Sequence, residues 1–356
     1  MNGDTYTYHY YIPVDNSGCG FYRMRVPSWT IMENNRTSKV KHLINEAFII
    51  PHDSLALQAL SSFRIQRWTS FNAKNYFDTI CAFRDKVGFK LIYDTDDVLQ
   101  KNALPEYNSY PVSEEVDKAS KYYMTHSDYV TTTTDVLKET LIELGVDKNK
   151  IFVIPNYLSR WWGDNFDCRR SLTNLKNNIN RPRIGIVCGK THFDINGLTR
   201  NCVDDFYEIS DWIIENRKKY QFVFMGGMNR KLNKYKDDFE IHDSVGTLSF
   251  MKKRVSLGIN LYIQPLLDCT FNRAKSNIKL LEAYGEGVPI LTQDLPVYAL
   301  NSENNFKNVN ELDTLVKSIL WNKVEYSNII SENYEKVQAY WIEDHISEWT
   351  KLMGIM

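Results

Sequence analysis

The chain has 356 residues, 43% hydrophobic and 24% charged, and its 43 basic and 44 acidic side chains nearly cancel. This length exceeds the size at which one hydrophobic core stops growing, so we expect two α/β domains. The balanced charge gives no overall field to attract a polyanion, no apolar run is long enough for a membrane span, and the first residues do not resemble a secretory signal. We therefore expect a cytoplasmic protein.

In the first half, short apolar runs alternate with segments of helical period, which is typical of parallel sheets built from βαβ units. We expect strands at 6–12, 47–50, 63–68, 89–93, 129–132 and 151–154. Helices are expected near 22–34, 54–61, 72–87, 113–125 and 134–144. Residues 1–158 then form a first Rossmann-like domain, on the acceptor side.

The polar segment 159–182 lacks a regular pattern and is the predicted linker. A second domain is expected at 183–311, with strands near 183–188, 221–225, 258–264 and 288–292 and helices near 201–219, 247–256 and 272–286. Residues 312–356 have a helical pattern that predicts packing across both domains. Doubly wound domains bind ligands outside the carboxyl ends of their strands, so motifs that follow strands are the candidate sites.

The densest motif follows the strand at 258–264, reads D-C-T-F-N-R-A-K-S-N-I-K-L-L-E and ends at Glu282. Lys275, Lys279, Glu282 and Glu286 recur at helical spacing on one face of an expected crossover helix. A helix start with free N–H groups, Ser276 and a lysine suits a diphosphate, and Glu282 can accept hydrogen bonds from ribose hydroxyls. The alternative is a solvated helix face with charge pairs four residues apart.

The pattern F-N-x-x-K-S-x-x-K-x-x-E followed by G-V-P-I-L resembles the donor-binding segment of family-four-type GT-B glycosyltransferases, especially the phage and capsular-type members. The resemblance covers most of the chain, from the turn near Gly18 to Tyr298. It implies an α/β fold of the GT-B class, in which two Rossmann-like doubly wound domains face each other across a cleft and the C-terminal helices cross back.

The same resemblance implies that Lys275 and Ser276 hold the donor phosphates and that Glu282 holds the ribose. Asn272 and Lys279 belong to the same donor-binding segment. The family usually has an acidic residue eight positions before the equivalent of Glu282. This chain has Ala274 at that position and so departs from the family pattern. We expect the usual contact to the transferred sugar to be altered.

A second motif, I-G-I-V-C-G-K-T-H-F-D, runs from a strand into a turn. Gly189 lets the backbone approach a ligand, Lys190 offers a charge to a phosphate, and His192 lies in the same turn. The resemblance assigns this loop to the diphosphate, and the turns at Gly227 and Gly246 to the nucleobase and its ribose. The alternative is an ordinary surface turn.

A third motif follows the first strand and contains Gly18, Gly20 and Arg23. Two glycines ahead of a helix suit a close approach of backbone to ligand, and Arg23 adds donors. The motif lacks the third glycine of a dinucleotide fingerprint. The resemblance makes it the interdomain loop beside the donor diphosphate.

A fourth motif, Y-D-T-D-D-V, places Asp94, Asp96 and Asp97 at a strand end. Carboxylates this close raise one another's pKa values, so Asp96 or Asp97 can serve as a base or orient an acceptor hydroxyl. Two alternatives remain: a D-x-D metal site of the GT-A type, or a loop that caps the following helix.

These motifs predict a glycosyltransferase that moves a hexosyl or pentosyl group from a nucleotide diphosphate sugar to an acceptor hydroxyl. Asp96, Asp97, Lys190 and Lys275 are the expected catalytic residues. The six cysteines form no C-x-x-C pair, and we expect neither a metal nor another cofactor. If the anomeric configuration is retained, a phosphate oxygen takes the acceptor proton; if it is inverted, Asp96 or Asp97 takes it.

The acceptor has several alternatives. An AT-rich, phage-like composition favours a hydroxymethylated base of phage DNA, in a host cytoplasm, whereas the near-neutral net charge counts against DNA. A surface glycan or a small glycoside is the second class of acceptor. A nucleotide-sugar epimerase and a non-catalytic nucleotide-binding module of the same fold are further alternatives. The basic residues expected to contact DNA phosphates are Lys39, Lys41, Arg64, Arg67, Lys74 and Arg84.

Overall fold

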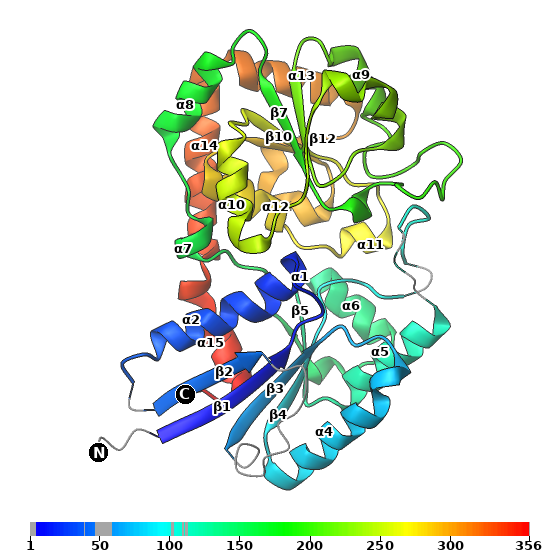
Figure 1. The fold of residues 1–356 in the computed structure, drawn as a ribbon, viewed down its shortest axis with the longest axis vertical. Coiled ribbons are helices and arrows are strands. Elements are labelled where there is room, and N and C mark those ends of the chain that lie inside the picture. Colours follow the sequence, from blue (N-terminus) through cyan, green and yellow to red (C-terminus); the bar gives the residue numbers. More distant parts are fainter. Residues whose placement is uncertain are drawn as a thin grey trace.

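The computed structural model describes residues 5–38, 40–46, 59–100, 103–108, 110 and 113–355. These residues form two parallel sheets of six strands each, one in each half of the chain, with helices on their faces (Figure 1). The two halves are stacked end to end and face each other, as the sequence predicts. None of the helices in the described ranges combines the length and apolar character of a membrane span.

The first domain contains a sheet with the strand order β2-β1-β3-β4-β5-β6. Its strands are β1 Thr5–Ile12, β2 Val40–Glu46, β3 Leu60–Gln66, β4 Lys90–Asp94, β5 Tyr129–Thr132 and β6 Ile151–Val153. Its helices and helical turns are α1 Gly18–Gly20, the π-helical turn η1 Phe21–Arg25, α2 Val26–Asn34, η2 Phe71–Ala73, α4 Lys74–Val87, α5 Glu114–His126, α6 Asp135–Glu143 and η3 Lys148–Lys150. The loop after β1, which leads into α1, points at the second domain (Figure 1).

The second domain has the strand order β12-β11-β10-β7-β8-β9. Its strands are β7 Arg183–Val187, β8 Gln221–Met225, β9 Glu240–His242, β10 Leu261–Gln264, β11 Ile290–Gln293 and β12 Asn305–Phe306. Its helices and helical turns are η4 Lys190–His192, α9 Ser210–Asn216, η5 Arg230–Asp238, α10 Thr247–Ser256, α11 Thr270–Arg273, α12 Ile278–Glu286 and η6 Pro296–Asn304. The strand order reverses between β7 and β10, and a crevice is expected at such a switch point.

The remaining helices belong to the segment between the two sheets and to the C-terminal part of the chain. They are α7 Arg160–Gly163, α8 Cys168–Asn177, α13 Val309–Trp321, α14 Lys323–Val337, η7 Gln338–Tyr340 and α15 Ile342–Met353. Helix α14 packs on α12 and α8 of the second half, and α15 returns to pack on α2 and β4 of the first (Figure 1). The predicted crossing of the C-terminal helices is confirmed.

Helix α15 is anchored by Trp349, which is buried in the first domain. The guanidinium carbons of Arg23 and Arg64 lie 4.9 and 5.2 Å from the centroid of its ring. Both arginines are fully buried, and cations attract the face of an indole ring most strongly where water is excluded. One hydrophobic cluster joins residues of both domains, including Phe21, Trp162, Tyr262 and Trp341.

Most predicted strands and helices lie where the structure places them, and the exceptions have local causes. The strand expected at 47–50 and most of the helix at 54–61 lie outside the described residues, but the end of that helix is wrong because Leu60 begins β3. The sequence did not predict strand β2. This strand lies at the edge of the sheet, where polar and apolar residues can both occur, so its sequence lacks the apolar run of a buried strand. The segment 159–182 is not irregular throughout, since it contains α7 and α8.

The helix expected at 201–219 is shortened to α9. Asp204 accepts hydrogen bonds from the backbone nitrogens of Asp194 and Phe206 (3.0 and 2.8 Å), so its side chain competes with helical bonding. Strands β9 and β12 were also missed, because three and two residues carry too little pattern.

Candidate functional site

The predicted crossover helix at 272–286 is two helices, α11 and α12, with a turn between them. Lys275 and Ser276 lie in this turn, so the prediction that Lys275 shares a helical face with Glu282 is wrong. Asn277 precedes α12, and no side chain caps the first turn of that helix. Its first N–H groups are therefore available to an anion.

Glu282 is buried, with 2% of its side chain exposed. Its Oε1 accepts a hydrogen bond from the Tyr22 hydroxyl (2.7 Å), and its Oε2 accepts from Arg254 Nη1 (3.0 Å) and Lys279 Nζ (3.2 Å). Glu286 is buried too, and its Oε2 accepts from Arg254 Nε at 3.0 Å. Burial excludes the alternative of a solvated face for the two glutamates.

The two lysines of the motif have different surroundings. Lys275 Nζ lies 4.4 Å from the Phe271 ring centroid, and within the described ranges it has no carboxylate partner. Lys279 instead pairs with Glu282. Beside Lys279, a small pocket is lined by Arg254 and by the ends of β7 and β10. Arg254 Nη2 is buried without a hydrogen-bond partner. Arg254 and Lys279 are thus balanced by Glu282 and Glu286, whereas Lys275 has no carboxylate partner among the described residues.

The loop after β7 carries the second predicted motif. Gly189 and Lys190 are exposed, so the backbone and the lysine are accessible. His192 Nδ1 lies 2.7 Å from Asp205 Oδ2. Burial and the nearby Lys275 lower the pKa of His192, although Asp205 opposes them. The imidazole is therefore neutral at neutral pH.

The two glycine turns next to this loop differ. A Cβ on Gly227 would lie 2.5 Å from the Phe193 ring, so a glycine is needed there for packing. Gly246 precedes α10 with nothing within 4 Å of its Cβ position. A side chain at position 227 would clash with Phe193, whereas Gly246 is open on its Cβ side.

The first domain contacts the donor motif directly. Asn156 Nδ2 donates to Ser276 Oγ (2.9 Å), and Thr134 Oγ1 donates to the Ala274 carbonyl (2.9 Å). Ala274, which replaces the acidic residue of the family, is 1% exposed. These bonds and the Tyr22–Glu282 bond hold the cleft closed around the start of α12.

Asn272 is fully buried. Its Nδ2 donates to Asp205 Oδ1 (2.8 Å) and to the Leu267 carbonyl (2.9 Å), and it lies 3.2 Å from the Tyr107 hydroxyl. The Nδ2 group is therefore occupied by the protein, whereas Oδ1 is buried without a hydrogen-bond partner among the described residues.

The loop after β1 is built differently from the prediction. A Cβ on Gly20 would lie 2.1 Å from the Asp15 carbonyl oxygen, so this glycine serves the fold of the loop. Arg23 is fully buried, pairs with Asp94 (2.7 Å) and donates to the Ile154 carbonyl (2.5 Å). Its predicted role beside the donor diphosphate is wrong, because its charge is neutralised inside the first domain. Gly18 is partly exposed.

The carboxylates after β4 are divided between two arginines. Asp94 faces Arg23, whereas Arg67 Nη1 pairs with Asp97 Oδ2 (2.6 Å) and Arg67 Nε lies 3.3 Å from Asp96 Oδ1. Asp94 and Asp96 therefore do not form the D-x-D alternative. Burial raises the pKa of Asp96, although Arg67 opposes this. Arg67 has a φ of +48°, a strained conformation of the kind that is often found at functional sites.

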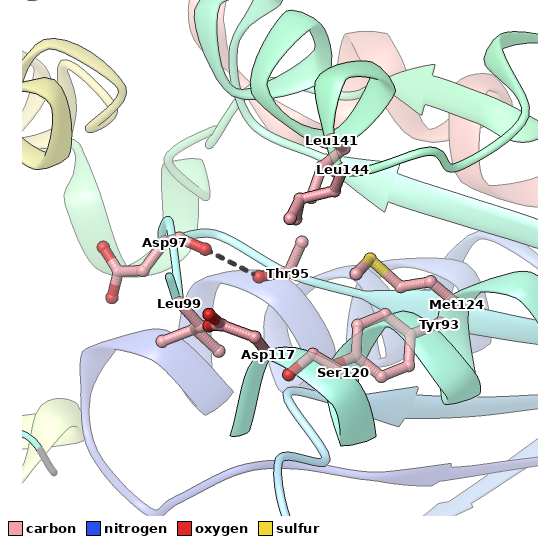
Figure 2. Close-up of a pocket in the computed structure, with 9 residues that line it drawn as sticks. All are labelled: Tyr93, Thr95, Asp97, Leu99, Asp117, Ser120, Met124, Leu141 and Leu144. Carbon is pink, nitrogen blue, oxygen red and sulfur yellow. Dashed lines mark hydrogen bonds between the residues drawn. The ribbon is translucent and has the colours of Figure 1, made fainter. Parts of the chain in front are cut away.

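Cys19 Sγ, Asp96 and Asp97 also have ligand atoms within 4.8 Å of one another, a grouping that could hold a metal ion. Arg67 already places a positive charge on both carboxylates. Figure 2 shows Asp97 at one end of a small pocket that continues between α5 and α6 to Met124 and Leu141.

The basic residues expected to contact DNA do not form an exposed patch. Arg64 is buried, Arg67 and Lys74 pair with aspartates, and Lys39 lies outside the described residues. Arg84 pairs with Asp85 (2.9 Å), whereas Lys41 is partly buried and donates to a carbonyl. The prediction that Arg64 contacts phosphates is wrong.

Sequence reasoning missed Tyr22, Tyr107, Asp205 and Arg254, and it named Arg67 only as a DNA contact. Tyr22 and Arg67 follow β1 and β3, so the rule that ligands meet strand ends could have identified them. Tyr107 lies in a segment without regular period, Asp205 lies in the segment expected to be a helix at 201–219, and Arg254 lies inside a helix. Their partners are distant in sequence, so no local pattern marks them.

A scan against protein families found no match, and neither did a search of curated proteins. Solved structures are similar in fold. Sucrose-phosphate synthase from Thermosynechococcus elongatus is 12% identical, with 97% of this chain and 98% of that chain covered and a TM-score of 0.62. HepE from Anabaena in complex with UDP and glucose is 10% identical, with coverage of 96% and 98% and a TM-score of 0.60. A glycosyltransferase from Rickettsia africae is 11% identical, with coverage of 98% and 99% and a TM-score of 0.60. The likeness extends over both domains, and the chain has the GT-B fold.

Proposed function

We propose that the chain is a glycosyltransferase that uses a nucleotide diphosphate sugar as donor. The observation that carries the proposal is the uncapped start of α12, which follows Lys275 and Ser276. Ser276 Oγ accepts a hydrogen bond from Asn156 of the first domain, and Glu282 is buried in α12. Free N–H groups and lysines suit a diphosphate. Similar folds hold UDP and UDP-glucose in HepE, which supports UDP as the first nucleotide to test.

In this proposal the bond between the anomeric carbon and the diphosphate breaks, and a bond from an acceptor oxygen to that carbon forms. Lys275, Lys190 and the start of α12 stabilise the negative charge on the departing diphosphate. The acceptor proton passes to a phosphate oxygen if configuration is retained, or to Asp96 or Asp97 if it is inverted. The lysines supply the charge that a metal would otherwise provide.

We propose a hydroxyl of a glycan or small glycoside as the acceptor, in preference to DNA. Asp96 and Asp97 follow β4, and their carboxylate oxygens can accept hydrogen bonds from hydroxyls. The residues expected to contact DNA are mostly buried or paired. A phage DNA base would need phosphate contacts that these side chains do not supply.

A thermal-shift panel of nucleoside diphosphates and nucleotide sugars tests the donor, because a ligand that binds the folded chain stabilises it by RT ln(1 + [L]/Kd) and raises its unfolding temperature. The best nucleotide sugar is then incubated with and without glycan, glycoside and hydroxymethylated-DNA acceptors, and products are identified by mass spectrometry. Transfer supports the proposal. An epimerised donor without acceptor indicates an epimerase, and binding without any product indicates a binding module.

A further inference from the structure

Asp205 is a buried aspartate in the second domain that joins four groups. Its Oδ2 lies 2.7 Å from His192 Nδ1. Its Oδ1 accepts hydrogen bonds from the Tyr107 hydroxyl (2.6 Å), from Asn272 Nδ2 (2.8 Å) and from the backbone nitrogen of Leu267 (2.8 Å). Only 1% of its side chain is exposed.

The contacts of Asp205 determine which nitrogen of His192 carries the proton. A neutral imidazole has one N–H donor and one acceptor nitrogen. An ionised carboxylate only accepts, so the nitrogen that faces Asp205 must be the donor. Nε2 is then the acceptor. Burial and Lys275 lower the pKa of His192, which keeps the ring neutral.

His192 Nε2 is free to bind a ligand. The side chain of His192 is 13% exposed, and Nε2 has no hydrogen-bond partner among the described residues and is not sealed from solvent. The charged groups around the ring are Asp205, Lys275 and Lys279, and Lys190 belongs to the same short helical turn. The free nitrogen therefore lies among the residues proposed to hold the diphosphate.

An acceptor nitrogen can accept a hydrogen bond from a hydroxyl. It is not complementary to an ionised phosphate oxygen, because the nitrogen and the oxygen are both acceptors. We propose that Asp205 is a positioning residue that fixes His192 with its proton on Nδ1, so that Nε2 accepts a hydrogen bond from a hydroxyl of the glycosyl group of the donor. This inference rests on the proposed function. It gives the site a means of distinguishing a nucleotide sugar from the nucleotide alone.

The Tyr107 hydroxyl belongs to the first domain and offers a matched control. It contacts the other oxygen of Asp205, so its loss removes a bond between the domains and leaves the His192–Asp205 contact in place. Tyr107→Phe should therefore leave the proton of His192 on Nδ1, whereas Asp205→Asn should move it to Nε2 or divide it between the nitrogens.

The first measurement is a long-range ¹H–¹⁵N spectrum of the full chain with labelled histidine, which distinguishes protonated from unprotonated ring nitrogens. The chain has seven histidines, and the signals lost in His192→Phe identify the one required. We expect Nδ1–H in the unmodified chain and in Tyr107→Phe, and a changed proton position in Asp205→Asn. A proton on Nε2 in the unmodified chain overturns the positioning role without requiring any variant to fold.

The second measurement compares UDP with UDP-glucose by calorimetry. We expect His192→Phe to weaken UDP-glucose about tenfold and UDP by less than twofold, and UDP-glucose alone to shift the Nε2 signal of the unmodified chain. Equal losses for the two ligands, or no shift, contradict the contact with the glycosyl group. If neither UDP nor UDP-glucose binds, the proposed contact with the glycosyl group and the choice of UDP as donor nucleotide are both contradicted. The spectrum still decides whether Asp205 positions His192.

Discussion

The hydroxyl of Tyr22 donates a hydrogen bond of 2.7 Å to Glu282 across the cleft between the domains. Tyr22 belongs to the π-helical turn after β1, and Glu282 belongs to α12. The oxygen that Tyr22 occupies is one of the two that a ribose would need under the proposed function. Donor binding and this contact between the domains therefore compete for one carboxylate.

We expect Tyr22→Phe to bind UDP about tenfold more tightly, because a hydrogen bond to a charged group is worth about 1.5 kcal/mol and no longer has to be broken. Calorimetry measures the affinity. Tyr11→Phe is the matched control, since its hydroxyl donates to Glu46 within the first domain at 3.3 Å. Weaker binding of UDP by Tyr22→Phe would show that the tyrosine belongs to the donor site itself.

Glu282 has a structural role as well as the proposed one. We expect Glu282→Ala to lower the free energy of unfolding by about 3 kcal/mol, because Arg254 stays buried with Glu286 as its remaining carboxylate partner. Glu282→Gln keeps the shape of the side chain and should fold, yet bind UDP several-fold more weakly. Urea unfolding and calorimetry separate the two effects. Unchanged UDP affinity in folded Glu282→Gln would remove Glu282 from the donor site.

Lys275 and Lys279 should differ in their effect on turnover. Lys275 has no carboxylate partner among the described residues, whereas Lys279 pairs with Glu282. We expect Lys275→Ala to lower kcat about a hundredfold, as loss of one group that stabilises the leaving charge does elsewhere, and Lys279→Ala to do less. Steady-state kinetics with the donor found in the thermal-shift panel decide this. Equal losses would indicate a general basic surface.

Transfer should proceed fully in a chelator. Arg67 pairs with Asp96 and Asp97, and Arg23 pairs with Asp94, so these three carboxylates already have cationic partners. We expect Asp96→Asn and Asp97→Asn to reduce transfer while nucleotide-sugar binding stays nearly constant. Activity that is lost in chelator and restored by manganese or magnesium would assign Cys19, Asp96 and Asp97 to a metal site and overturn our reading of this loop.

Stability should fall below pH 6.5 because of His9. Burial, His42 and Arg64 lower the pKa of His9 from 6.5 to about 3, so the folded chain binds this proton less readily than the unfolded chain does. The stabilisation is complete above pH 6.5 and is lost progressively as the pH falls towards 3. Between pH 7 and 5 the free energy of unfolding should drop by about 2 kcal/mol more than in His9→Gln. Urea titrations at the two pH values measure the difference, and identical drops would contradict the assignment.

The sequence predicted the two Rossmann-like domains and the edge of the sheets where the candidate site lies. Both depend on local properties, namely the periodicity of apolar residues and the positions of strand ends. The strands at 129–132 and 221–225 and the helix at 247–256 agree with the structure to the residue. The sequence did not predict that α11 and α12 are separate. The break depends on contacts with the first domain, such as the bond from Thr134 to the Ala274 carbonyl.

The partners of charged residues could not be predicted either. Arg23 resembles a phosphate-binding residue in sequence because it follows a glycine turn, and its burial against Asp94 depends on a strand 71 residues away. The reverse holds for Asp205, which has no motif around it and yet joins His192 to the first domain. Local pattern locates loops, whereas tertiary contacts decide which of their side chains remain free.

The indole ring of Trp349 covers two buried arginines of the first domain, although it lies near the other end of the chain. During synthesis all six strands of the first sheet therefore leave the ribosome long before the side chain that seals Arg23 and Arg64. Domains generally begin to fold in the order of synthesis. The first domain, however, can complete its packing only after α15, the last helix of the chain, has been synthesised. A fragment that stops before α15 should expose both arginines, and a version of the chain divided between its two domains must keep the last helix with the first.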